Sequence, residues 1–200
     1  MLFDPNRHEA LGTVPWDEVF ARQAVQHIVA DTLLHFDAQT LWPTHPRDLE
    51  PGEAKLPVAA LYHGAAGVIW ALERLRDKGG AAVVFDFGPT VAGLLEHNRR
   101  FNAASEIDKH SYLLGDSGVL LLQFKHSGSK PTARVLFELV KDNLHNPTHE
   151  ALWGSPGTLV AALHMLEATG EERWLQVFRR GVDILWEQMH PAAGFDDTWV

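Results

Sequence analysis

The sequence predicts an all-α fold built from repeated pairs of helices. Apolar residues recur at the three- and four-residue spacing of a helix along most of the chain. Proline, glycine and capping residues divide these periodic stretches into about seven helical segments. Three Gly-x-x-Gly units also recur. The intervals between their first glycines, from 64 to 115 and from 115 to 154, are 51 and 39 residues, which is typical of repeat architectures.

The first helix is predicted over about residues 16–36. It follows Pro15, and Asp17 and Glu18 fall in its first turn, where carboxylates complement the helix dipole. The next segment, residues 42–57, is rich in proline and is therefore predicted to be a loop.

The second, fourth and sixth helices are predicted to begin directly after Gly67, Gly118 and Gly157. Their apolar residues are not confined to one face. Val119-Leu120-Leu121-Leu122, for example, covers every side of the fourth helix. Helices with this pattern are buried all round, so these three are expected to form an inner layer.

The other helices carry apolar residues on one face only, which predicts an outer layer with the opposite face in water. Pro89 and Pro131 stand at favoured first-turn positions. Thr169-Gly170-Glu171-Glu172 matches a capping box at the start of the last helix. The outer helices are predicted at about residues 16–36, 89–101, 131–143 and 171–189.

Six glycines open the inner helices, and the role expected of them is structural. Glycine permits positive φ values and a close approach of neighbouring backbones at a turn. The six residues are Gly64, Gly67, Gly115, Gly118, Gly154 and Gly157.

The segments around these glycines are similar to elements of a known family. They are Leu61-Tyr62-His63-Gly64-Ala65-Ala66-Gly67-Val68, Ser111-Tyr112-Leu113-Leu114-Gly115-Asp116-Ser117-Gly118 and Ala151-Leu152-Trp153-Gly154-Ser155-Pro156-Gly157-Thr158. In order and spacing they resemble three successive Gly-x-x-Gly elements of lanthionine synthetase C-like (LanC-like) proteins, over most of the chain. The resemblance implies an α/α toroid of inner and outer helices. Residues 1–200 would form one incomplete toroid domain, truncated at its C-terminal end.

The resemblance also implies a chemistry. In the LanC-like family, a zinc ion held by two Cys and one His activates a thiol for addition to a dehydroamino acid, either within a peptide or from glutathione. The family's zinc ligands lie in later repeats, and this chain contains no cysteine. The cyclases carry an acidic residue where Ser111 stands and a His where Trp153 stands. The expectation is therefore a chain without zinc that is not catalytic by itself, whose catalytic residues stay unknown and whose ligand is a peptide or a small thiol.

Two polar residues beside the Gly-x-x-Gly units are candidates for an inner-rim site. His63 directly precedes the first unit, and Asp116 lies inside the second. Gly115-Asp116-Ser117-Gly118 resembles the nucleophile turn of trypsin-like proteases, but that mechanism needs a β-barrel scaffold with a His and an Asp in set geometry. The N–H groups of this turn could bind an anion, which the charge of Asp116 opposes. A capping role for Asp116 or Ser117 is expected instead.

No metal site is predicted. His145 and His149 have the spacing of metal ligands on a helix, but Pro147 between them interrupts a regular helix face. If zinc were bound, His63, His110, His145 and His149 would be the residues to consider. Carboxylate pairs of a sugar-processing α/α toroid enzyme are a further option. The candidates for such pairs are Asp86, Asp116, Glu150, Asp196 and Asp197.

Composition narrows the classes of partner. The net charge of −9 at pH 7 disfavours nucleic acid and anionic membrane surfaces. No stretch approaches the roughly 20 apolar residues that span a bilayer. The absence of cysteine excludes disulfides and fits a cytoplasmic protein.

Two alternatives to the LanC-like chemistry stay open. One is a non-catalytic peptide-binding or scaffold module that uses the concave centre of the ring, and the other is a carbohydrate-active α/α toroid enzyme.

The last predicted helix raises a separate expectation about self-association. Its apolar residues cannot all be covered by one preceding pair of helices, so self-association through an uncapped terminal repeat is expected. These residues are Trp174, Phe178, Val182, Leu185 and Trp186.

Overall fold

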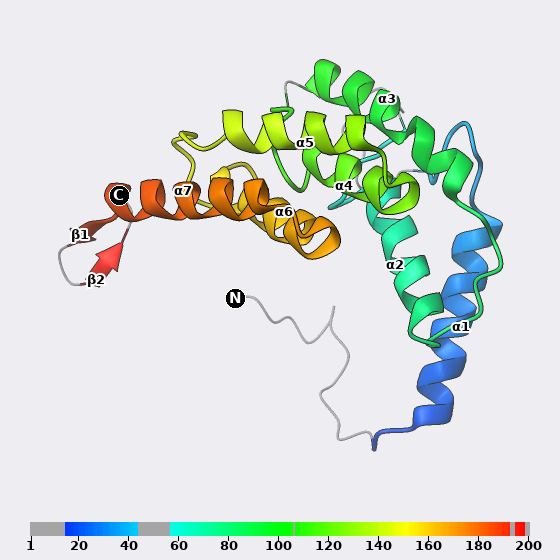
Figure 1. The fold of residues 1–200 in the computed structure, drawn as a ribbon. Coiled ribbons are helices and arrows are strands. Elements are labelled where there is room, and N and C mark those ends of the chain that lie inside the picture. The colour runs from blue at the N-terminus through cyan, green and yellow to red at the C-terminus, as the bar shows by residue number, and fades with distance from the viewer. Residues whose placement is uncertain (1–14, 44–56, 106, 193–194, 199–200) are drawn as a thin grey trace.

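The computed structural model describes residues 15–43, 57–105, 107–192 and 195–198. Within them the chain forms seven helices followed by one short hairpin (Figure 1). The helices are α1 (Glu18–Leu34), α2 (Ala65–Asp77), α3 (Gly88–Ser105), α4 (Asp116–Ser127), α5 (Lys130–Asp142), α6 (Ser155–Thr169) and α7 (Glu172–Gln188). The hairpin pairs β1 (His190–Ala192) with β2 (Phe195–Thr198) in antiparallel register, with His190 opposite Thr198. The predicted all-α fold of about seven helices is confirmed, and the hairpin was not foreseen.

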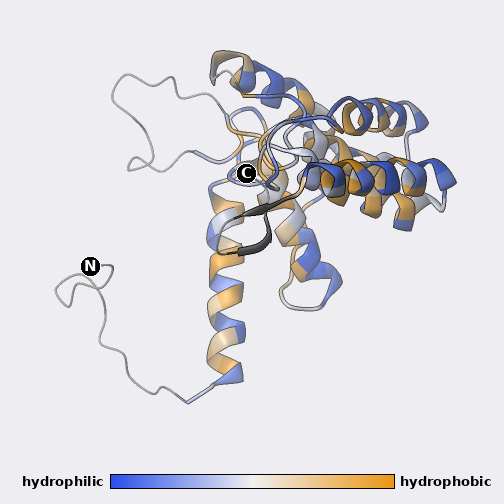
Figure 2. Cartoon of the chain, turned by 90° about the vertical axis from the view of Figure 1, so that its left-hand side faces the viewer, coloured by the Kyte–Doolittle hydropathy of each residue, from blue (hydrophilic) through white to orange (hydrophobic). Residues whose placement is uncertain are grey.

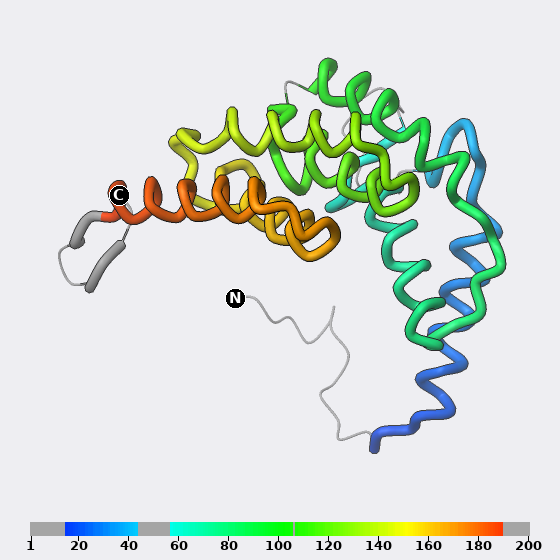
Figure 3. The backbone as a smooth tube through the Cα atoms, viewed as in Figure 1, coloured from blue at the N-terminus to red at the C-terminus, as the bar shows by residue number. Residues whose placement is uncertain are grey.

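The helices follow an arc from α1 and α2 at one end to α7 at the other (Figures 1 and 3). The three Gly-led helices contact one another in order along it, because α4 packs against both α2 and α6. Helices α3 and α5 lie on the convex side, and each packs on the helix that follows it. The chain therefore alternates between an outer and an inner helix.

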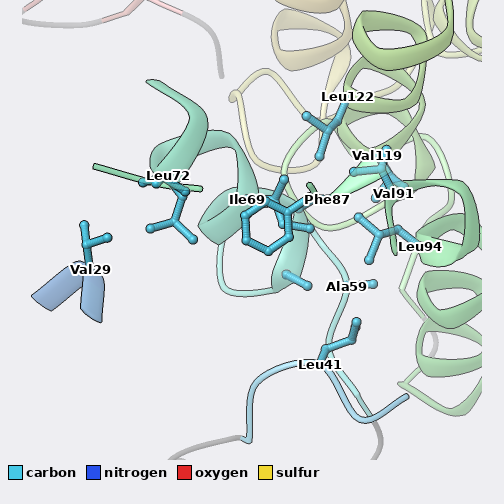
Figure 4. Packing of buried hydrophobic residues seen from close by; sticks show 13 residues of the cluster. Val29, Leu41, Ala59, Ile69, Leu72, Phe87, Val91, Leu94, Val119 and Leu122 are labelled. Carbon is cyan, nitrogen blue, oxygen red and sulfur yellow. The ribbon is translucent and has the colours of Figure 1, made fainter. Parts of the chain in front are cut away.

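Two apolar clusters hold the arc together. The first core joins α1, α2, α3 and one side of α4 (Figure 4). The second core joins the other side of α4 to α5, α6 and α7. Within α4, Val119 and Leu122 belong to the first core and Leu120 to the second. An inner helix that is apolar on all sides thus connects two cores, as its sequence pattern predicts.

Burial follows the predicted layers. Seven of the 15 residues of α6 are buried, against one of the 17 residues of α1. The same contrast separates α4 from α3. The prediction that the Gly-led helices are the more buried ones is confirmed.

The inner helices begin earlier than predicted. Each starts directly after the first glycine of its unit, so that Gly64, Gly115 and Gly154 are the N-caps in extended conformation. In α2 the first helical bond runs from the Val68 N–H to the Gly64 carbonyl. The second glycine of each unit therefore lies inside the first turn, where it allows close packing.

Two predicted caps are wrong in detail. Asp17 is the N-cap of α1 and not part of its first turn, because its carboxylate accepts from the Phe20 N–H at 3.0 Å. The capping box at Thr169 does not form. The Thr169 hydroxyl donates to the Met165 carbonyl instead, and Gly170 ends α6 in the left-handed conformation at φ 65°. The connection between α6 and α7 is too short to contain both the C-terminal cap of α6 and a capping box for α7.

The exposed apolar residues at the two ends of the arc differ from those predicted. On α7, Trp174 is fully buried, and Phe178, Val182 and Leu185 pack against the second core, so only Trp186 of the five apolar residues is largely exposed. The larger uncovered apolar group lies at α1, which Figure 2 shows with hydrophobic residues along its length. Its exposed members are Trp16, Val19, Phe20, Ile28 and Leu34. Self-association stays a prediction.

No helix in the described part of the chain is long and apolar enough to cross a membrane.

Candidate functional site

The second glycine of each unit sits against the main chain that leads into it. A Cβ atom at Gly67 would lie 2.1 Å from the carbonyl oxygen of Leu61, and one at Gly157 would lie 2.2 Å from that of Ala151. At Gly118 the nearest atom is the carbonyl oxygen of Tyr112, at 2.5 Å. No side chain fits at these distances, so glycine is required by close approach. The structural role predicted for these glycines agrees with this packing.

The loops before the inner helices also pack on one another. The side chain of Leu61 lies over Gly118, and the side chain of Tyr112 lies over Gly157. The Tyr62 N–H donates to the Leu113 carbonyl at 2.9 Å. The Ser111 hydroxyl donates to the Leu152 carbonyl of the third unit. Successive units are thereby locked in register, and they present the residues of their loops on one common surface.

This common surface is hollowed into a groove of about 740 Å³. Four residues from the loops line one part of it: Leu61, Tyr62, Tyr112 and Leu113. Side chains of the three inner helices line the rest: Trp70, Leu121, Leu122, Phe124, Lys125, His164 and Ala168. Gly67, Gly118 and Gly128 complete the lining. The first two Gly-x-x-Gly units therefore contribute one glycine each to the groove, and the third contributes through the helix that follows it.

The groove is apolar and aromatic. Tyr62 is 70% exposed and Trp70 is 50% exposed, which is unusual for aromatic residues of this size. Burial raises the pKa of Tyr112, so its hydroxyl stays protonated at neutral pH. Lys125 is the one Lys or Arg residue of the described lining, which contains no carboxylate. A ligand of this groove would make mostly apolar contacts, with a few directed polar ones.

Lys125 is held in place by a buried acid. Its ammonium group lies 2.9 Å from Oε2 of Glu73, a residue of α2 that is 3% exposed. The other oxygen of Glu73 lies 2.9 Å from Nε2 of His126. The pairing fixes Lys125 at the edge of the groove and joins α2 to α4. Sequence analysis missed Glu73, because nothing in its local pattern distinguishes it from a solvated helix residue.

Asp116 has a different role from the one predicted. Its side chain does not cap α4. It is 1% exposed, with Oδ2 2.7 Å from Nε of Arg99 and Oδ1 accepting from the Asn98 side chain at 3.2 Å. Both partners belong to the outer helix α3, so Asp116 faces the layer interface and is not part of the groove lining. Ser117 donates to the His110 carbonyl and does not cap either. The protease-like turn is therefore a structural element.

His63 lies at the surface beside the groove but does not line it. Its ring lies 6.0 Å from the ring of Tyr62 and 6.4 Å from that of Phe101. Partial burial lowers the pKa of His63. His63 therefore lies next to the groove and not in its lining, because the loop turns its ring toward α3.

The remaining candidates do not converge on a catalytic centre. Asp86 accepts from the Gly88 N–H, and Glu150 accepts from the N–H groups of Leu152 and Trp153. These carboxylates organise turns. His149 lies 3.1 Å from the side-chain oxygen of Gln188. The side chains of Asp196 and Asp197 lie outside the described residues.

The part of the chain that the structure describes holds no group of three or more His, Cys, Asp or Glu residues that could bind a metal ion. The family-type zinc site needs two cysteines, which this chain does not contain. The residues present therefore do not fit that site.

Comparison with known proteins adds no assignment. No family model matches the chain, and neither a curated protein nor a solved structure shows significant similarity to it.

Proposed function

We propose that this chain is a LanC-like protein, part of an α/α toroid, that uses its concave groove to bind an apolar segment of polypeptide. The observation that carries the proposal is the groove itself, an aromatic hollow of about 740 Å³ lined by the first two Gly-x-x-Gly units and by side chains of all three inner helices. Ligand sites are commonly concave and mainly apolar, with a small number of placed polar groups. The groove has each of these features.

The dimensions of the groove suit an extended chain. Its lining follows α4 from Gly118 to Gly128, which corresponds to about 15 Å at 1.5 Å per helical residue. An extended peptide advances about 3.3 Å per residue, so four or five residues would fill this length. Exposed Tyr and Trp side chains supply a large contact area at a low cost in conformational entropy. The lining therefore favours a short peptide segment.

The described lining of the groove lacks the residues that LanC-like thiol addition and glycoside hydrolysis each require. Thiol addition of the LanC-like type needs a zinc site that the residues of this chain do not fit, so no catalytic step is assigned to it. Glycoside hydrolysis needs two carboxylates flanking the ligand, and the described lining contains none. Binding is the function that the lining residues support without a further component.

The test is to fill the groove without disturbing the cores. Ala168 of α6 lines the groove and is exposed, so Ala168→Phe places a ring in the groove. Ala104 of α3 is also exposed and lies outside the groove, so Ala104→Phe is the matched control. Binding of a set of fluorescent ten-residue peptides, graded in apolar content, is measured by anisotropy for the unchanged chain and both variants.

The proposal predicts that the apolar peptides bind the unchanged chain and the control variant equally. It predicts at least tenfold weaker binding to Ala168→Phe, which corresponds to a loss of about 1.4 kcal/mol. Equal binding to Ala168→Phe would place the peptide elsewhere on the molecule, and no binding by any peptide would refute the proposal.

A further inference from the structure

Every polar side chain of the groove can donate a hydrogen bond, and those of Lys125 and Trp70 can only donate. Lys125 carries an ammonium group, Trp70 an indole N–H, and Tyr62 and Tyr112 one hydroxyl each. His164 adds one imidazole. The described lining includes no Asp, Glu, Asn, Gln, Ser or Thr side chain. A ligand therefore meets apolar surface and more side-chain donors than acceptors, because only the two Tyr hydroxyls and the imidazole can also accept.

Three of these donors are unused inside the protein. Within the described residues, neither the indole N–H of Trp70 nor the hydroxyl groups of Tyr62 and Tyr112 form a hydrogen bond to another residue. Lys125 contacts Glu73, but an ammonium group has three N–H donors, so it retains capacity for a ligand. The ligand that matches these groups carries acceptors.

An ordinary extended peptide fits such a lining poorly. Its main chain brings one N–H donor for every C=O acceptor, and a donor that leaves water without a partner weakens binding about tenfold. Proline has no N–H. A proline-rich segment in the polyproline II conformation presents solvated carbonyl groups and apolar rings, and aromatic-lined grooves recognise such segments.

We infer that the groove binds a proline-rich segment in the polyproline II conformation, with its carbonyl groups facing Trp70, Tyr62 and Tyr112. This inference rests on the proposed peptide-binding function and narrows its ligand class. At 3.1 Å per residue, about five residues of polyproline II cover the 15 Å of groove along α4. The described lining contains no carboxylate, so it offers no ion-pair partner to a basic residue of the segment.

Peptide composition provides the first test. Three acetylated and amidated decapeptides are compared by isothermal titration calorimetry, with repeats of Pro-Pro-Leu, Ala-Ala-Leu and Gly-Gly-Leu. The Pro-Pro-Leu peptide is expected to bind at least tenfold more tightly than the other two. Equal or tighter binding of the Ala-Ala-Leu peptide would overturn the inference and leave the proposed function standing. Failure of all three peptides and of the graded set would overturn both.

The donor groups provide the second test. Trp70→Phe keeps an aromatic ring but removes the N–H, and Trp186→Phe changes an exposed tryptophan outside the groove as the control. Trp70→Phe is expected to weaken binding of the Pro-Pro-Leu peptide about fivefold, the usual effect of losing one hydrogen bond. Trp186→Phe is expected to leave it unchanged. An unchanged Kd for Trp70→Phe, in a variant with an unchanged melting temperature, would overturn the inference.

Discussion

The two end helices of the arc, α1 and α7, have similar lengths but differ in how many of their residues are buried. Helix α1, predicted to be apolar on one face only, is apolar on more than one side, yet Val29 is its single buried residue. Helix α7 is sharply one-sided, and it buries Trp174, Val177 and Ile184 against the second core. Total apolar content therefore does not decide burial. An apolar stripe stabilises a helix when a neighbouring helix offers a complementary surface, and α6 offers one to α7.

The strongest test of this comparison is to remove the anchor of α7. Trp174 is fully buried, and its ring lies 5.1 Å from that of Phe137 in an edge-to-face arrangement. Trp174→Ala is expected to lower the free energy of unfolding by about 3–5 kcal/mol, because it leaves a large cavity. Urea denaturation followed by circular dichroism measures the change.

The matched substitution at the other end is Phe20→Ala. Phe20 is 69% exposed on α1, and the expected loss is within about 0.5 kcal/mol. Comparable losses for the two variants would show that α1 is anchored as firmly as α7, and the contrast between the ends would be wrong.

The glycines offer a second comparison between the two regions. A Cβ at Gly157 would meet the Ala151 carbonyl oxygen, whereas a Cβ at Gly93 of α3 would meet nothing within 4 Å. Gly157→Ala is expected to cost about 2–4 kcal/mol through backbone displacement. Gly93→Ala is expected to stabilise the chain by up to about 1 kcal/mol, because alanine favours a helix interior. Thermal melts of both variants should shift in opposite directions.

The pair of Asp116 and Arg99 joins the inner helix α4 to the outer helix α3. Asp116→Ala would leave the buried amide of Asn98 without its acceptor. Arg99 is half exposed and can return to water. The expected loss is therefore about 1–3 kcal/mol, the cost of one unsatisfied buried group. A double substitution with Asn98→Ala should cost less than the sum of the two single changes, and strict additivity would argue against the contact.

The smallest expected effect concerns His63. Partial burial lowers its pKa from 6.5, so folding favours the neutral ring. The contribution of the neutral His63 ring to the free energy of unfolding is present above the pKa of the unfolded state. It is lost as the pH falls through the pKa of the folded state. His63→Gln is expected to remove a few tenths of a kcal/mol of acid sensitivity below about pH 6.5. An NMR titration of the ring should give a midpoint below 6.5, and a midpoint above it would reverse the sign.

Much of the fold could be predicted because its signals are local. Helical periodicity and turn residues marked all seven helices, and the contrast between Val119-Leu120-Leu121-Leu122 and the one-sided helices predicted which layer is buried. Boundaries were less accurate. The second glycine of each unit resembles a helix breaker in sequence, but in the structure it belongs to the first turn, where tertiary contacts exclude a side chain.

The candidate site could be predicted only in part. The loops that line the groove were singled out through their glycines, and Tyr62 and Tyr112 lie within those segments. Trp70 could not be identified as a groove residue, because a sequence pattern does not distinguish an exposed aromatic from a buried one. Glu73, Asn98 and Arg99 were missed, since each acts on a residue of another helix.

The sequence by itself determined the number of helices, their alternation between outer and inner layers, and the need for glycine at the start of each inner helix. These properties depend on residues a few positions apart, whose spacing a helix converts directly into a face. Tertiary structure alone decided that α1 would stay largely exposed, that Asp116 would pair with α3, and that the first two units and the inner helices would line a groove between Tyr62 and His164. Those outcomes depend on which surfaces meet across long stretches of chain, and that information is not contained in local spacing.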